Sequence, residues 1–141
     1  MKYIIEAKDP KYTIEVKDPI TDNSFDIHTQ TNYIREINIG DFFIHFKHEL
    51  KQVDENGKEY PITLYLYTIL NIAYNASDNV GNVKYFVIYK NILSGDVYAR
   101  DIKEFLSLVD KEKYPEIKSK FRFTKCDALG NIIEWCYKKE E

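Results

Sequence analysis

The sequence predicts a mainly β fold, a small antiparallel β-barrel closed by one short helix at about residues 102–109. Three observations lead to this prediction. Between residues 39 and 105, apolar side chains recur at alternate positions, which is the spacing of β-strands. Turn sequences separate these stretches, and the apolar spacing becomes helical once. The chain also contains 12 Tyr and 8 Phe, and aromatic rings favour strands because they fit a pleated, half-buried surface.

Length and charge set the expected organisation of the chain. A chain of 141 residues is expected to form one domain with extensions, and it can fold without a metal or a disulfide. We expect an N-terminal extension at residues 1–36, the barrel at residues 37–124, and a C-terminal hairpin strand and tail at residues 125–141. The formal net charge of −3 argues against a protein that binds phosphate backbones, so a nucleic-acid partner is possible but not favoured.

A tandem repeat of nine residues opens the chain. Residues 2–10 are followed by a similar unit at residues 11–19, and each unit alternates apolar and polar positions before it ends in Asp-Pro. The two copies could pair as a hairpin or lie along an edge of the barrel. Two interpretations stay open: a docking strand that recruits a partner by edge addition, or a duplication that lengthened an edge strand. Residues 21–31 are polar and are expected to form a loop.

Four strands are predicted to form the body of the barrel. The first alternates cleanly, so Phe43, His45 and Lys47 share one face of it. The pair Asn56 and Gly57 then indicates a hairpin, because both residues tolerate the positive φ angles of a type I′ turn. The third strand carries apolar side chains on both faces, which is typical of a central strand. The four strands are expected at residues 41–53, 62–74, 83–90 and 97–100.

The predicted helix follows the fourth strand. Four apolar residues between Ile102 and Val109 lie at helical spacing. Asp101 and Glu104 form a capping-box pattern, in which two side chains satisfy the free N–H groups of the first turn. Pro115 is expected to mark the end of the helical region.

Two cysteines, Cys126 and Cys136, are too few for a disulfide framework. They flank a predicted C-terminal hairpin whose strands are residues 121–126 and 132–137. Simple pairing would place Cys126 opposite Ile132, so the two thiols are not expected to bond to each other. We interpret them as small buried apolar residues.

Several segments together resemble a known family, the bacterial "domain of unknown function 1653" family, over about residues 39–123. They contain a Gly and an aromatic before His-aromatic-Lys, a Val-x-Tyr, an aromatic-x-Arg and a closing Arg-Phe. The segments are Gly40 to Lys47, Tyr65 to Ala73, Val87 to Tyr89, Tyr98 to Phe105, and Arg122 with Phe123. The resemblance implies an SH3-like small barrel in a bacterial cytoplasmic protein with no assigned activity. The chain departs from the family pattern at Asp101, where Pro is usual, at residues 75–78, and in a longer loop after Lys47.

The sequence contains no pattern that requires a particular reaction. It lacks a Gly-x-Ser-x-Gly motif and a phosphate-binding loop, so no catalytic residue is assigned and an enzyme is the least favoured class. His45 and His48 are three residues apart on a predicted strand and would point to opposite faces, while His28 lies in a distant loop. No metal site and no cofactor are therefore expected.

The termini and apolar runs indicate a cytoplasmic protein with reduced thiols. The first six residues lack the apolar core of a signal peptide. The longest apolar run, at residues 62–74, is interrupted by polar residues and is shorter than the roughly 18 apolar residues of a membrane-spanning helix. No membrane partner is expected.

One cluster of aromatic and basic side chains supports a binding hypothesis. In a barrel of this size, the first and fourth strands can line the same rim without being adjacent, and Tyr89 could supply a third wall. Aromatic rings stack on planar ligands, and Arg and Lys pair with carboxylate or phosphate groups. A nucleobase, a nucleotide or an acidic peptide would fit such a rim. The candidate site residues are Phe43, His45, Lys47, Tyr89, Tyr98 and Arg100.

A structural interpretation of the same cluster also stays open. His45 would then be a hydrogen-bonded residue at a barrel seam, and Arg100 would pair with Asp101, Glu104 or a carbonyl group. The favoured function class is a non-enzymatic binding module for a small ligand. The alternative is a protein-interaction or self-assembly module that acts through its edge strands, with a homo-oligomer as one outcome.

Overall fold

The structure is a computed structural model of the chain, and it describes residues 5–8, 11–18, 31–77, 85–133 and 137–138. The chain divides into two compact units. The first contains residues 1–38 and 135–141, and the second contains residues 39–134. No helix within these described ranges is both long enough and apolar enough to cross a membrane.

The first unit holds a four-stranded antiparallel sheet in the order β1-β2-β3-β9. Its strands are β1 (Ile5–Lys8), β2 (Lys11–Asp18), β3 (Thr31–Asn38) and β9 (Tyr137–Lys138). The two copies of the nine-residue repeat pair with each other as an antiparallel hairpin, with Lys8 opposite Lys11. This is one of the two arrangements expected for the repeat.

Strand β3 was not predicted, because residues 32–36 carried no expected element and residue 31 was placed in a loop. The segment does alternate: Tyr33, Arg35 and Ile37 occupy one set of positions and Ile34 and Glu36 the other. It pairs with β2 along its whole length and with β9 near its start. The polar residues around this segment gave no strand signal in the sequence, and pairing with β2 and β9 stabilises the strand.

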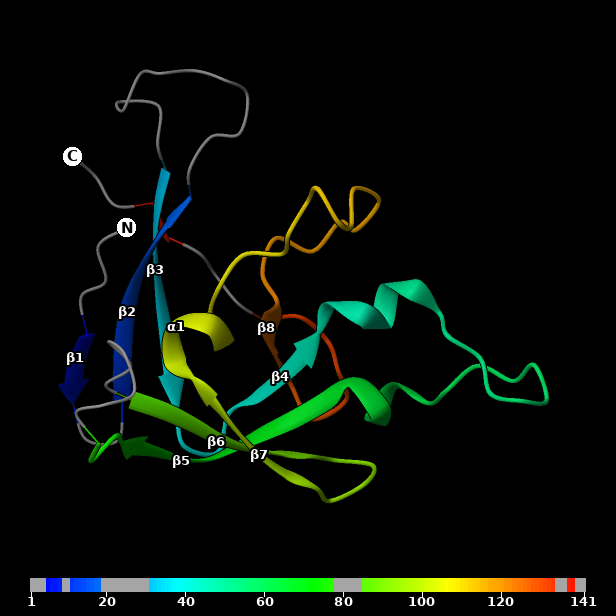
Figure 1. Cartoon of the computed structure of the whole chain (residues 1–141), viewed down its shortest axis with the longest axis horizontal. Helices are drawn as coiled ribbons and strands as arrows, with labels where there is room; N and C mark the ends of the chain where they lie inside the picture. The colour runs from blue at the N-terminus through cyan, green and yellow to red at the C-terminus, as the bar shows by residue number, and fades with distance from the viewer. Residues whose placement is uncertain (1–4, 9–10, 19–30, 78–84, 134–136, 139–141) are drawn as a thin grey trace. The chain divides into compact units, whose positions relative to one another are not determined.

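The second unit is built on a five-stranded antiparallel sheet that curls into a half-barrel, in the order β7-β6-β5-β4-β8 (Figure 1). One short α-helix, α1 (Ile102–Phe105), packs against β6 and β7. The prediction of a mainly β fold with a small curled antiparallel sheet and one short helix is confirmed for the part of the chain that the structure describes. The strands are β4 (Phe42–His45), β5 (Leu66–Tyr74), β6 (Tyr85–Asn91), β7 (Val97–Asp101) and β8 (Phe123–Cys126).

Two 3₁₀ helices replace parts of the predicted strands. They are η2 (Phe46–Leu50) and η3 (Ile62–Tyr65), so the expected strand character at residues 46–50 and 62–65 was wrong. The first strand ends early because the His45 side chain caps η2, accepting a hydrogen bond from the backbone N–H of Lys47 at 3.1 Å. The hairpin predicted at Asn56 and Gly57 is confirmed, since Val53 and Glu59 bridge across it. Its expected type I′ turn was wrong, because Gly57 has a positive φ of 78° and Asn56 does not.

Helix α1 is shorter than the predicted residues 102–109. Asp101 caps its N-terminus as expected, since the carboxylate accepts the backbone N–H two residues along at 2.8 Å. The second half of the capping box does not form in the expected way, because the Glu104 carboxylate pairs with the side chain of Arg100. The chain has already left the helix well before Pro115, and residue 108 bridges to residue 121.

The core of the second unit is a cluster of aromatic rings from four elements. Phe105 of α1 and Phe123 of β8 stack at 4.1 Å between ring centroids, with an interplanar angle of 8°. Phe43 of β4 meets Phe105 edge to face at 5.2 Å, and Tyr89 of β6 meets it at 5.0 Å. Each such pair adds about 0.5–1.5 kcal/mol beyond the burial of its area, so the cluster ties the helix to three strands.

The C-terminal hairpin forms only at its turn. Cys126 bridges Ile132, as the sequence predicted, and the backbone N–H of Ile133 donates to the carbonyl of Lys125 at 3.0 Å. The pairing expected for the rest of residues 132–137 was wrong where it is described, because Tyr137 joins the sheet of the first unit through β9. Cys126 is buried with a free thiol, whose pKa burial and, to a lesser degree, the nearby Asp127 carboxylate raise to about 12. Cys136 lies outside the described residues.

The core assignment is tested by a matched pair of leucines. Leu106 is fully buried behind α1, whereas Leu129 is 78% exposed in the hairpin turn. We expect Leu106→Ala to lower the free energy of unfolding by about 2–5 kcal/mol, because it removes transfer energy and leaves a cavity. Leu129→Ala should change it by less than about 0.5 kcal/mol. Urea unfolding of both variants measures this, and equal effects would contradict the core described above.

Candidate functional site

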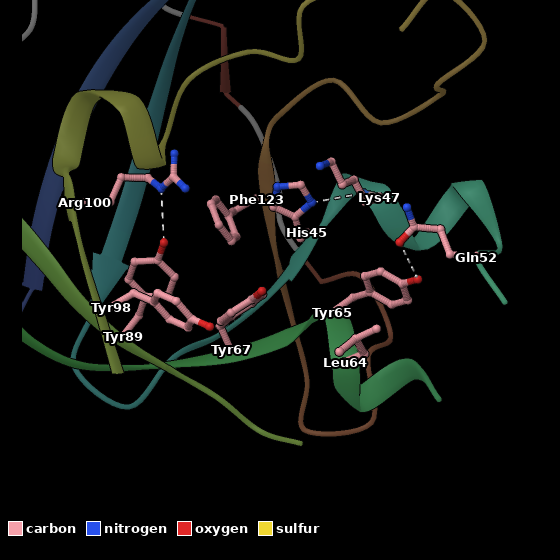
Figure 2. Close-up of a pocket in the computed structure, with 10 residues that line it drawn as sticks. All are labelled: His45, Lys47, Gln52, Leu64, Tyr65, Tyr67, Tyr89, Tyr98, Arg100 and Phe123. Carbon is pink, nitrogen blue, oxygen red and sulfur yellow. Dashed lines mark hydrogen bonds between the residues drawn. The ribbon is translucent and has the colours of Figure 1, made fainter. Parts of the chain in front are cut away.

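A pocket of about 300 Å³ lies among the strands of the curled sheet and the two 3₁₀ helices (Figure 2). Five of the six candidate residues predicted from the sequence line it. They are His45, Lys47, Tyr89, Tyr98 and Arg100. The structure therefore brings the ends of the first and fourth predicted strands to one opening, although β4 and β7 are not neighbours in the sheet.

Phe43, the sixth candidate, does not line the pocket. It is fully buried, and the ring of Phe105 covers it from α1. Phe43 and His45 do lie on the same face of β4, since they are two residues apart on a strand. Alternation gives the face of a strand but not the depth at which each side chain lies. Phe43 is therefore a core residue.

Five further residues line the pocket that the sequence reasoning did not select: Gln52, Leu64, Tyr65, Tyr67 and Phe123. The sequence carried a signal for Tyr65 and Tyr67, because Leu and Tyr alternate at residues 64–67, although Tyr65 reaches the pocket from η3 and not from a strand. Phe123 reaches the pocket because β8 pairs with β4, which places it directly opposite His45. Gln52 lies in an irregular loop after η2, and no sequence pattern marked it.

Strand register builds the aromatic wall of the pocket. Tyr89 on β6 lies directly opposite Tyr98 on β7, and their ring centroids are 5.6 Å apart. Tyr67 on β5 meets Tyr89 at 5.4 Å and Phe123 at 5.5 Å, in edge-to-face contacts. Tyr89 and Phe123 are buried, whereas Tyr98 is 44% exposed. The wall therefore joins the core at one side and reaches solvent at the other.

Arg100 is held on this wall by two partners. Its Nε donates a hydrogen bond to the Tyr89 hydroxyl at 3.1 Å, and its Nη1 pairs with the Glu104 carboxylate one helical turn later. The guanidinium carbon lies 5.9 Å from the ring centroid of Phe123. Burial acts to lower the pKa of Arg100, but the contacts with Tyr89 and Glu104 outweigh it and raise that pKa. The ion pair with Glu104 is one of the structural roles left open for this residue.

His45 is a neutral histidine with a defined tautomer. Its Nδ1 accepts the backbone N–H of Lys47, so the single ring proton is on Nε2. Its ring stacks on Phe46 at 4.5 Å and meets the edge of Phe123 at 4.9 Å. Burial is the largest cause that lowers the pKa of His45 to about 3, and four nearby basic side chains contribute to the same shift. In decreasing order of effect, these groups are Lys47, Arg122, Arg100 and His48.

The 3₁₀ helix that carries Lys47 is anchored to a distant part of the chain. Phe46 packs with Val109 and Ile117. The Glu49 carboxylate accepts the backbone N–H groups of Lys118 and Ser119, each at 2.8 Å. Lys47 therefore approaches the pocket from a turn whose position is fixed by packing and by charge-assisted hydrogen bonds.

The pocket is basic within an acidic chain. Lys47 and Arg100 line it, Arg122 acts on His45 from nearby, and no carboxylate is among the lining residues. Glu104 offsets part of the charge of Arg100. Within the described ranges, no group of three or more His, Cys, Asp or Glu residues is placed to hold a metal ion, and His28 lies outside them. The arrangement offers N–H donors, cations and ring faces to a bound molecule.

No protein-family model matches the chain, and no curated protein or solved structure matches it either. The resemblance to the domain of unknown function 1653 family stays a prediction made from the residues alone. The fold and the site are therefore argued from the contacts described above.

The lowered pKa of His45 predicts a loss of stability in mild acid. In the unfolded chain His45 binds a proton near pH 6.5, whereas in the folded chain it does so only near pH 3. Between these values the unfolded state binds more protons, so the free energy of unfolding falls as the pH falls, by roughly 2 kcal/mol between pH 7.5 and pH 5. His45→Asn keeps an acceptor for the backbone N–H of Lys47 but removes the titrating ring, so this dependence of stability on pH should disappear. Urea unfolding of both proteins across this range measures the difference, and parallel pH profiles would contradict the assignment.

Proposed function

We propose that this protein is a non-enzymatic binding module that takes a small, planar, anionic ligand in the pocket between β4 and β7. One observation carries the proposal: the same cavity is lined by two cations, a neutral histidine and several aromatic rings, with no carboxylate among its lining residues. Rings favour a planar partner, and cations favour carboxylate or phosphate groups.

The size of the pocket limits the ligand. A volume of about 300 Å³ is at the lower end of the range for small-molecule sites. A single aromatic or heterocyclic ring with one acidic group fits this volume better than a dinucleotide. Nucleotide-like molecules and acidic aromatic side chains of peptides belong to this class.

The local charge supports an anion although the whole chain is acidic. The net charge of −3 repels anions weakly at long range, but salt screens this repulsion beyond about 8 Å at physiological ionic strength. At short range, the ligand instead lies in a partly buried site that Lys47 and Arg100 line. Charge-assisted hydrogen bonds in such a site are roughly twice as strong as neutral ones.

We also propose that the chain is a diverged bacterial and cytoplasmic relative of the domain of unknown function 1653 family. The residues that carry the resemblance support this, because several of them gather at the pocket. His45 and Lys47 come from the His-aromatic-Lys segment, Tyr98 and Arg100 from the aromatic-x-Arg segment, and Phe123 from the closing Arg-Phe. If the family pattern serves to bind a ligand, its residues are expected to gather in one pocket in this way.

A thermal-shift screen tests the binding proposal. A ligand at 100 times its dissociation constant should stabilise the protein by about 2.7 kcal/mol, which corresponds to several degrees in Tm. We expect planar aromatic acids and nucleotides to raise the Tm, and aromatic amines of similar size to leave it unchanged. The double variant His45→Asn, Arg100→Met should fold and lose the response. A response only to amines, or none in the whole screen, would refute the proposed function.

The alternative function, self-assembly through an edge strand, is favoured by one feature of β7. This strand is at the end of the five-stranded sheet, and among the strands that the structure describes it pairs only with β6. Three of its five residues, Val97, Tyr98 and Ala99, are exposed. An exposed edge of this kind can pair with a second strand.

The edge-strand alternative predicts concentration-dependent association. Val97→Lys would place a charge on the exposed edge of β7 and should return the protein to a monomer. Leu93, in the neighbouring turn, is 50% exposed. Leu93→Lys adds the same charge there and should leave association unchanged. Multi-angle light scattering across a range of concentrations distinguishes these results. A wild-type protein that stays monomeric throughout would exclude this alternative.

A further inference from the structure

We propose that the acidic group of the ligand binds between Lys47 and the Nε2–H of His45, and that Arg100 is a positioning residue that orients the aromatic wall. The ligand class that follows is an aromatic ring that carries a carboxylate or phosphate group. This inference rests on the proposed binding function and assigns different roles to residues of the same pocket.

The Lys47 end of the pocket has unused hydrogen-bonding capacity. The Nδ1 atom of His45 is occupied by the backbone of Lys47, but no residue in the described part of the chain contacts Nε2 through a hydrogen bond. The Lys47 ammonium likewise has no acidic partner among the described residues. Figure 2 shows the two side chains next to each other above the cavity. A neutral N–H donor and a cation side by side form a site for an anionic oxygen.

The Arg100 end is already engaged. Its Nε is bound to the Tyr89 hydroxyl, and its Nη1 is bound to the Glu104 carboxylate. The Glu104 charge offsets part of the local attraction that Arg100 would exert on a second anion. What Arg100 fixes is the orientation of Tyr89, whose ring contacts both Tyr67 and Tyr98. Arg100 therefore acts on the ligand indirectly, by fixing the ring of Tyr89 against Tyr67 and Tyr98.

The space between the two ends accommodates a ring. In Figure 2, Tyr67 and Phe123 lie between two groups of side chains. Tyr89, Tyr98 and Arg100 are on one side, and His45 and Lys47 are on the other. A ligand ring placed against Tyr67 can direct its acidic group toward Lys47. Ring and charge are then recognised by different residues, so a substitution can remove one kind of recognition and leave the other.

Two probes separate these kinds of recognition: phenyl phosphate, which carries ring and charge, and benzyl alcohol, which carries the ring alone. NMR titration gives the affinity for each, and their ratio is the charge selectivity. We expect Lys47→Met to weaken the binding of phenyl phosphate at least tenfold and to leave the affinity for benzyl alcohol unchanged. Arg100→Met should weaken both probes by a similar factor and leave their ratio unchanged. In the wild type, phenyl phosphate but not benzyl alcohol should shift the His45 Nε2–H resonance.

Glu104→Gln provides the decisive control, because it frees the Arg100 charge without removing the side chain. If Arg100 bound the acidic group, this variant would bind phenyl phosphate more tightly, and that result would overturn the inference. Full phenyl phosphate affinity in a folded Lys47→Met variant, with Lys47→Gln as a second substitution, would overturn it as well. In both cases the proposed function would stand. If the wild type bound neither phenyl phosphate nor any other planar acid, the proposed function would fail and this assignment with it.

Discussion

The stacking of Phe105 on Phe123 is the contact on which the rest of the second unit depends. It joins the single helix to the edge strand β8, and Phe43 and Tyr89 close around it from β4 and β6. Because interiors are close-packed, rings that fill this centre fix the positions of those at its margin. His45 rests against the edge of Phe123. The candidate site is therefore the outer layer of the same aromatic cluster, and its geometry is inherited from the core.

Alternation and turn chemistry were sufficient to predict the sheet, the hairpin at Gly57 and the approach of His45 to Arg100. They failed where the local structure is decided by distant residues. The strand expected after His45 becomes a 3₁₀ turn because its side chain caps that turn and because Phe46 packs on residues more than sixty positions later. Phe43 illustrates a second limit, since a face of a strand can be inferred from spacing but burial depends on what packs above it.

The neutral state of His45 and the basic character of the pocket have one common origin. A buried ring surrounded by cationic groups cannot accept a proton at ordinary pH, so it remains a fixed N–H donor. The same cations that exclude the proton would attract an anion. A carboxylate or phosphate at this position would reduce the repulsion among these basic side chains. The same basic surroundings that make the fold less stable in mild acid are therefore those on which the proposed binding of an anion rests.

The hydrogen bonds from the backbone N–H groups of Lys118 and Ser119 to the Glu49 carboxylate link the 3₁₀ helix that carries Lys47 to a loop distant in sequence. This loop contributes no lining residue, yet it holds the turn that carries Lys47. Insertions or deletions around residues 110–119 would shift the ammonium group while the aromatic wall kept its place. Under the proposed function, a change in this surface loop would alter the ligand preference without altering any residue that lines the pocket.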